Sequence, residues 1–245
     1  MSLIKSNSNN YFLPKDYISN KSNFTLDNNR EKIYWSKERI ESSNYFQFHT
    51  YKLLSSMVNS DTTVLDIGCG FGVKLNKLIG KKTNNYVGID QKAAIDYCKS
   101  NYSTGEYFSV DIENQEIKLD RNFDFIICSD VIEHILNPDI LLEIIKNNAS
   151  ASTKVILSTP CRRRLRGFSN NESIKKEHVR EWSKDELINY LESSGFLVEQ
   201  TKLYPPFKIS LNNLKFFFRF IIKRFFEYKK GMNFFYNHTL VLSVK

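Results

Sequence analysis

The stretch VLDIGCGFG (Val64–Gly72) joins a short apolar run to three glycines at alternate positions. An apolar run of this length is typical of a strand that is covered on both faces. Gly68 and Gly70 permit positive φ and carry no Cβ, so a ligand can lie against the backbone. The following segment predicts a helix, whose free N–H groups and dipole favour an anionic group. The stretch therefore predicts a strand, a ligand-binding turn and a helix.

Short apolar runs alternate with helical segments around this stretch. The alternation over residues 61–200 predicts an α/β fold, a doubly wound and mostly parallel seven-stranded sheet. The expected strands are 64–67, 86–89, 107–110, 123–128, 155–158, 196–198 and 239–244. The expected helices are 72–80, 91–100, 138–148 and 183–194, with an N-cap at Asn137, a capping box from Ser183 and a C-cap at Gly195.

The length of 245 residues fits one domain with appendages. Residues 1–60 form an N-terminal arm and helical cap, of which 1–29 are expected to be mobile or loosely packed. Residues 61–245 form the main domain, with an aromatic, basic helical insertion at 207–230 before the last strand. The sequence shows neither a run of about 18 uncharged apolar residues nor a signal-peptide core, which favours a cytoplasmic location.

The net charge of +8 is concentrated in two segments. Residues 161–182 hold seven Lys/Arg against three Glu, and residues 202–230 hold eight against one. Such patches suit phosphate-bearing or acidic partners, or a membrane surface. The four cysteines form no CxxC pair, which suits reduced thiols better than a disulfide framework or a zinc site.

Acidic residues follow the next two expected strands. Asp90 comes about 20 residues after the glycine turn, where an acid grips a ribose diol in nucleotide-binding sheets. Asp111 ends the third strand, at the edge where ligands bind in open parallel sheets.

Together these motifs resemble a class I S-adenosylmethionine-dependent methyltransferase of the broad small-molecule group. The resemblance covers about residues 60–200, with 238–244 as a closing strand, and includes FDFIICSDVIEHI (123–135) as the fourth-strand motif. Glycines at intervals of two, in place of Gly-x-Gly-x-x-Gly, argue against a nicotinamide enzyme. The resemblance implies that S-adenosylmethionine is bound by Asp66, Gly68, Gly70, Gly72, Asp90 on the ribose, Gln91, Asp111 on the adenine amino group, Ile112 and Ser129.

Asp130, Glu133 and His134 follow the fourth strand, and His178 follows the fifth. Because these strand ends are neighbours, the four side chains can converge beside the sulfonium. One interpretation is a Mg²⁺ or Mn²⁺ site, similar to that of metal-dependent methyltransferases that modify hydroxyls, although Asp130 stands where Glu is commoner. The other is a metal-free base, His178 or His134, acting with Asp130. A purely structural role, such as His178 packing on Trp182, stays open.

Two basic segments are candidates for ligand or partner contacts. Arg162, Arg163, Arg164 and Arg166 follow the fifth strand and can clamp phosphates or carboxylates, or form a solvated loop. Within 207–230 the polar residues Lys215, Arg219, Lys223 and Glu227 recur at spacing four. That helix can lie on a membrane, cover the sheet, line the pocket, form a dimer contact or stack nucleic acid.

The resulting hypothesis is an O-methyltransferase acting on a small, anionic, hydroxyl-bearing metabolite. A sugar- or phosphate-containing precursor of a surface glycan, in a bacterium with an AT-rich genome, is one candidate acceptor. The alternatives are an RNA ribose 2′-O-methyltransferase and a non-catalytic cofactor-binding module that docks to a membrane or partner. No RNA-binding module is recognisable elsewhere, so a nucleic acid is not the expected partner.

Overall fold

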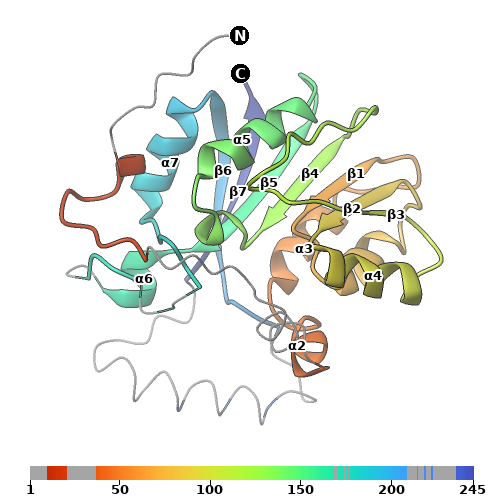
Figure 1. Cartoon of the computed structure of the whole chain (residues 1–245), viewed down its shortest axis with the longest axis horizontal. Coiled ribbons are helices and arrows are strands. Elements are labelled where there is room, and N and C mark those ends of the chain that lie inside the picture. Colours follow the sequence, from red (N-terminus) through yellow and green to blue (C-terminus); the bar gives the residue numbers. More distant parts are fainter. Residues whose placement is uncertain are drawn as a thin grey trace.

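The glycine stretch begins with β1, an inner strand of a seven-stranded sheet whose order is β3-β2-β1-β4-β5-β7-β6 (Figure 1). The computed structural model describes residues 10–20, 37–167, 170–173, 175, 177–208, 214, 218, 222 and 236–245. The strands are β1 (Val64–Ile67), β2 (Tyr86–Asp90), β3 (Glu106–Ser109), β4 (Phe125–Ser129), β5 (Lys154–Pro160), β6 (Phe196–Tyr204) and β7 (Asn237–Val244).

Only β7 runs against its neighbours in this sheet. Strands β1 to β5 pair in parallel, and β7 pairs antiparallel with both β5 and β6. Pro160 and Tyr204 both lie opposite Asn237, so the start of β7 meets the carboxyl ends of β5 and β6. The predicted doubly wound, mostly parallel sheet is confirmed.

The helices follow the predicted pattern, with one shortened. They are η1 (Asn10–Phe12), α2 (Lys37–Ser42), α3 (Phe48–Ser55), η2 (Leu75–Ile79), α4 (Lys92–Asn101), η3 (Ile132–His134), α5 (Pro138–Asn147), α6 (Arg162–Arg166) and α7 (Lys184–Ser193). The Asn137 cap and the Ser183 capping box are both present. The helix expected at 72–80 covers 73–79 and ends in the π-type turn η2, and Gly72 lies outside it because its φ of 62° is incompatible with a helix.

Two apolar clusters cover the two faces of the sheet. Leu65 belongs to the cluster packed under α5 and α7, whereas its neighbour Val64 belongs to the cluster under α3, η2 and α4 (Figure 1). Alternate side chains of a strand point to opposite faces, so both faces of β1 are buried. This two-sided burial explains why the strands are continuous apolar runs.

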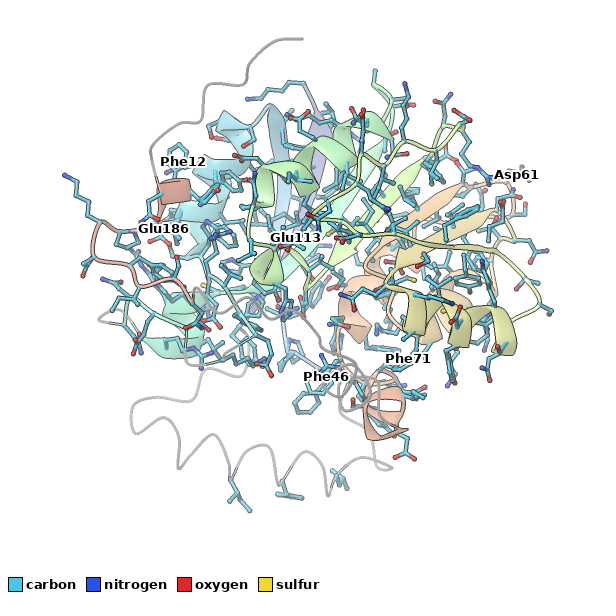
Figure 2. The ribbon with its side chains drawn as sticks, in the orientation of Figure 1. Phe12, Phe46, Asp61, Phe71, Glu113 and Glu186 are labelled. Atoms are coloured by element: carbon cyan, nitrogen blue, oxygen red, sulfur yellow. The ribbon has the colours of Figure 1, made fainter. Side chains whose placement is uncertain are left out.

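The N-terminal segment 10–20 packs firmly against the domain. Leu13 and Tyr17 are buried in the α5–α7 cluster, and the indole of Trp182 donates to the carbonyl of Tyr11 at 3.0 Å. Figure 2 shows Phe12 of this segment near Glu186 at the start of α7. The expectation of a loosely packed arm is wrong for these residues, because their apolar side chains fill a gap beside α7.

The structure describes only part of the insertion expected at 207–230. Phe207 is buried against Phe46, and Leu214, Phe218 and Ile222 are helical and exposed. The predicted polar stripe lies outside the described residues (Lys215, Arg219, Lys223 and Glu227). Among the described helices, none is both long enough and apolar enough to span a bilayer.

Candidate active site

The glycine turn connects β1 to η2 at the carboxyl edge of the sheet. Gly68, Gly70 and Gly72 have φ of 78°, 56° and 62°, a region that side chains other than glycine rarely adopt. A Cβ on Gly68 would lie 2.3 Å from Cγ2 of Val131, whereas a Cβ on Gly70 would meet nothing within 4 Å. Gly68 therefore lets the turn pack on the end of β4, and Gly70 faces open space that a ligand can occupy.

Asp90 ends β2 beside this open space. Its carboxylate accepts hydrogen bonds from the amides of Gly70 and Gln91, each at 2.7 Å. Burial raises the pKa of the Asp90 carboxyl, and the two amide donors oppose that shift. A carboxylate has about four acceptor positions, so Asp90 keeps capacity for two hydroxyl donors. The predicted ribose-binding residue and the glycine turn thus adjoin each other.

The other residues assigned to the cofactor are more dispersed. The exposed Asp111 carboxylate accepts from the amide of Glu113 and the side chain of Asn114, and Ile112 is half-buried beside it. Ser129 is buried at the end of β4, where its hydroxyl lies 2.7 Å from that of Ser158. Gln91 is exposed and is the N-cap residue of α4.

Asp66 is fully buried beneath the turn. Its Oδ2 accepts from the hydroxyl of Tyr51 at 2.7 Å, and its Oδ1 has no hydrogen-bond partner. Burial raises the pKa of Asp66 to about 7 and lowers that of the neighbouring Lys74 to about 8. Tyr51 comes from α3 in the helical cap. Its hydrogen bond to Asp66 could not be predicted from helical spacing in the sequence.

Asp130 lies directly after β4 in a left-handed conformation, with φ of 55°. Its Oδ1 accepts from Ser158 of β5 at 2.8 Å and from the side-chain amide of Asn237 at 3.1 Å. Asn237 was missed by sequence reasoning because it belongs to the antiparallel strand. The signal was available in principle, since the start of an antiparallel strand lies at the carboxyl ends of its neighbours.

Glu133, His134 and His178 converge. One ligand atom of each lies within 4.8 Å of the others, and the two imidazole rings meet edge to face with centroids 4.8 Å apart. His134 donates through Nδ1 to the carbonyl of Glu177 at 2.8 Å, and Nδ1 of His178 lies 2.7 Å from Oε1 of Glu181. Each ring therefore keeps Nε2 for the cluster. Asp130, predicted as a fourth ligand, is outside this group.

Glu133 is the most unusual member of this cluster. Its Oε2 accepts from the hydroxyl of Thr159 at 2.9 Å, but its Oε1 is buried and has no partner. Burial, reinforced by the charge of Asp130, holds the pKa of Glu133 well above its usual range. Such an orphaned oxygen beside two imidazoles fits a divalent cation, and the acceptors on both Nδ1 atoms are those that orient metal-binding histidines.

A family model described as a methyltransferase domain matches residues 26–201. The chain belongs to this methyltransferase family. Its use of S-adenosylmethionine follows from the family, and the open turn beside Asp90 fits that molecule. No curated protein matches the sequence.

Solved structures share the fold of the methyltransferase at low sequence identity. An S-adenosylmethionine-dependent methyltransferase from Aquifex aeolicus is 19% identical, with TM-score 0.56, covering 89% of this chain and 99% of its own. A chain in the complex of the Haloferax volcanii activator Trm112 with a methyltransferase is 16% identical, with TM-score 0.62, covering 86% and 96%. The [4+2]-cyclase SpnF is 11% identical, with TM-score 0.62, covering 86% and 94%. These likenesses concern the fold alone.

Burial favours the neutral form of both histidines in the cluster, His134 and His178. Burial, with His178 nearby, lowers the pKa of His134 to about 3. Burial also lowers the pKa of His178, although its bond to Glu181 opposes the shift. Neutral imidazole is the form that binds a metal ion or accepts a proton.

The arginine run is divided between the interior and the surface. Arg162 is buried, contacting Oε1 of Glu186 at 2.6 Å, and Arg166 holds the carboxylate of Glu181 through two bonds of 2.9 and 3.1 Å. A clamp of four arginines therefore does not form, because two guanidinium groups are engaged inside the fold. Arg163 and Arg164 are exposed, and their predicted contact with an acceptor stays a prediction.

Proposed function

We propose that the methyltransferase transfers the methyl group of S-adenosylmethionine to a hydroxyl oxygen, at a site where Glu133, His134 and His178 hold a divalent metal ion. Two observations carry this proposal: Oε1 of Glu133 is buried without a hydrogen-bond partner, and a carboxylate oxygen of Glu133 lies within 4.8 Å of a ring nitrogen of each histidine. Mixed oxygen and nitrogen donors favour Mn²⁺ or a similar ion over Mg²⁺.

The reaction forms a bond between the acceptor oxygen and the methyl carbon, and it breaks the bond from that carbon to the sulfonium sulfur. S-adenosylhomocysteine leaves, and the hydroxyl proton must be taken up. When bound, the metal ion makes a coordinated hydroxyl more acidic. Asp130 lies at the same edge, with its Oδ1 fixed by Ser158 and Asn237, and we assign it as the acceptor of the proton.

The cofactor residues contribute orientation. The carboxylate of Asp90, held by the amide of Gly70, would bind the ribose hydroxyls, with Asp111 further along the edge. In-line transfer needs the acceptor oxygen about 3 Å from the methyl carbon, so a fixed cofactor and a fixed acceptor together supply much of the acceleration.

The expected acceptor class follows from charge. Arg163 and Arg164 add positive charge at the end of β5, where an anionic group of the acceptor would lie. We therefore expect a small, anionic, hydroxyl-bearing metabolite, such as a phosphorylated or acidic sugar. Transfer to RNA oligonucleotides with a steep salt dependence would instead support the ribose methyltransferase alternative.

The metal site is tested by binding before activity. The metal-free protein titrated with Co²⁺ should develop the absorption bands of a nitrogen–oxygen site, and His178→Ala and Glu133→Gln should lose them. His49→Ala is the matched control, because His49 stacks on Tyr204 outside the cluster. If the unaltered protein shows no such bands and its methyl transfer resists a chelator, the metal site is overturned and a histidine is the base.

A further inference from the structure

Residues 10–20 contact the segment that carries His178. This segment, which we call the His178 loop, comprises the described residues 170–173, 175 and 177–183 between α6 and α7. We propose that Asn20 and Tyr17 are positioning residues for the acceptor site, holding the His178 loop so that His178 faces Glu133. The inference rests on the function proposed above, because it concerns the same three-residue cluster.

Asn20 satisfies several carbonyl groups of the loop. Its side-chain nitrogen lies 2.9 Å from the carbonyls of Lys175 and His178 and 3.3 Å from that of Ser173. Its backbone amide donates to the carbonyl of Val179 at 3.0 Å. One residue thus ties both sides of His178, in a loop whose described part has no helix or strand of its own.

Tyr17 holds the loop through Glu181. The amide of Glu181 donates to the hydroxyl of Tyr17 at 2.8 Å, and the ring of Tyr17 lies under the guanidinium of Arg162 at 5.1 Å. The fully buried carboxylate of Glu181 contacts Nδ1 of His178, and it also accepts from Arg166 and Ser173. The hydrogen bond from the Glu181 amide therefore supports the residue that orients the imidazole.

The other side of the loop is fixed by the metal-site residues themselves. The amides of Val179 and Arg180 donate to the carbonyl of Glu133 at 2.8 and 3.3 Å, and the carbonyl of Glu177 accepts from His134. The His178 loop is therefore bound between η3 and the N-terminal segment. Loss of the N-terminal contacts would leave the loop held only by η3 and by the bonds of Glu181 to Arg166 and Ser173, and Nε2 of His178 would sample positions away from Glu133.

The test compares Asn20→Ala with Asn101→Ala in the full chain. Asn101 also donates to a backbone carbonyl, but at the exposed end of α4. Partners that orient a metal ligand are typically worth about 10–100-fold in metal affinity or activity. We expect Asn20→Ala to lower Co²⁺ affinity and kcat by about 10-fold or more on this scale. The Kd for S-adenosylmethionine should stay unchanged, and Asn101→Ala should match the unaltered protein throughout.

Two further variants keep the test decisive. Tyr17→Phe removes one hydroxyl and should show the same pattern more weakly, which serves if Asn20→Ala fails to fold. Asn20→Gln keeps the amide donor and should recover part of the Co²⁺ affinity. If Asn20→Ala and Tyr17→Phe both bind Co²⁺ and turn over like Asn101→Ala while His178→Ala does not, the positioning role is wrong and the proposed function stands. If His178→Ala also retains Co²⁺ binding, both proposals are overturned.

Discussion

We call the surroundings of Gly70 and Asp90 the cofactor half of the carboxyl edge, and the proposed site around Asp130, Glu133 and His178 the acceptor half. These two halves are held together in different ways. In the cofactor half, Gly70 and Asp90 are 20 residues apart and joined by one hydrogen bond, from the backbone amide of Gly70 to the side-chain carboxylate of Asp90. In the acceptor half, side-chain amides join residues far apart in the chain: Asn20 donates to the carbonyl of His178, and Asn237 donates to Asp130. A local turn fixes one geometry, and a long-range polar network fixes the other. Damage to the network should therefore impair acceptor chemistry while cofactor binding survives.

The largest effect is expected from Glu181→Ala. Removing one partner of a buried ion pair typically costs about 3–5 kcal/mol, because the other charge stays buried. Here Arg166 would keep its charge with a fully buried guanidinium. We expect the free energy of unfolding, measured in urea, to fall by about this amount. Glu192→Ala on the exposed end of α7 is the control, and equal stability of the two variants would contradict the role of the network.

Gly68→Ala should damage the cofactor half next most strongly. The new Cβ would meet Val131 at 2.3 Å while φ stays at 78°, so overpacking and backbone strain together should cost about 2–4 kcal/mol. Gly70→Ala has the strain without the contact and should cost about 1 kcal/mol. Urea unfolding of both variants measures the difference. Recovery of stability in Gly68→Ala/Val131→Ala would identify the contact as its source.

Asp90→Ala tests the independence of the two halves. Hydrogen bonds to a charged group are worth about 1.5–3 kcal/mol, so the affinity for S-adenosylmethionine should fall by about 10–100-fold. Co²⁺ binding at the acceptor half should not change. Calorimetry measures both, with Asp96→Ala, an exposed acid paired with Lys92, as the control. Unaltered cofactor affinity would refute the assignment of Asp90.

The last prediction concerns pH. Burial raises the pKa of Asp66 from 3.8 to about 7, so the folded protein retains a proton that the unfolded chain releases. This contribution to stability is complete below pH 3.8 and is lost as pH rises through 7. The slope is at most about 1.4 kcal/mol per pH unit for one proton. Compared with Asp66→Asn, the unaltered protein without cofactor should lose stability between pH 5 and 7. If urea unfolding shows that the stability of the unaltered protein and that of Asp66→Asn depend on pH in the same way, Asp66 is ionised throughout this range.

The same contrast explains what the sequence could predict. The strands, the caps of α5 and α7 and the glycine turn depend on neighbouring residues, and the structure confirms them. The engagement of Arg162 and Arg166 was hidden, because their acidic partners lie 15 or more positions away in the chain. The packing of Tyr17 was hidden for the same reason, since a polar segment of low periodicity gives no sign of the loop that it contacts.

The reversed direction of β7 has a consequence for how this enzyme could diversify. Tyr204 and Asn237 face each other and Asn237 contacts Asp130, so the chain between them leaves and returns at one place beside the end of β4. Recombination could exchange that whole stretch as a cassette while every strand register is preserved. Chimeras that keep the sheet and graft this stretch from a relative would show whether new acceptor preferences evolve by exchange at one point of the fold.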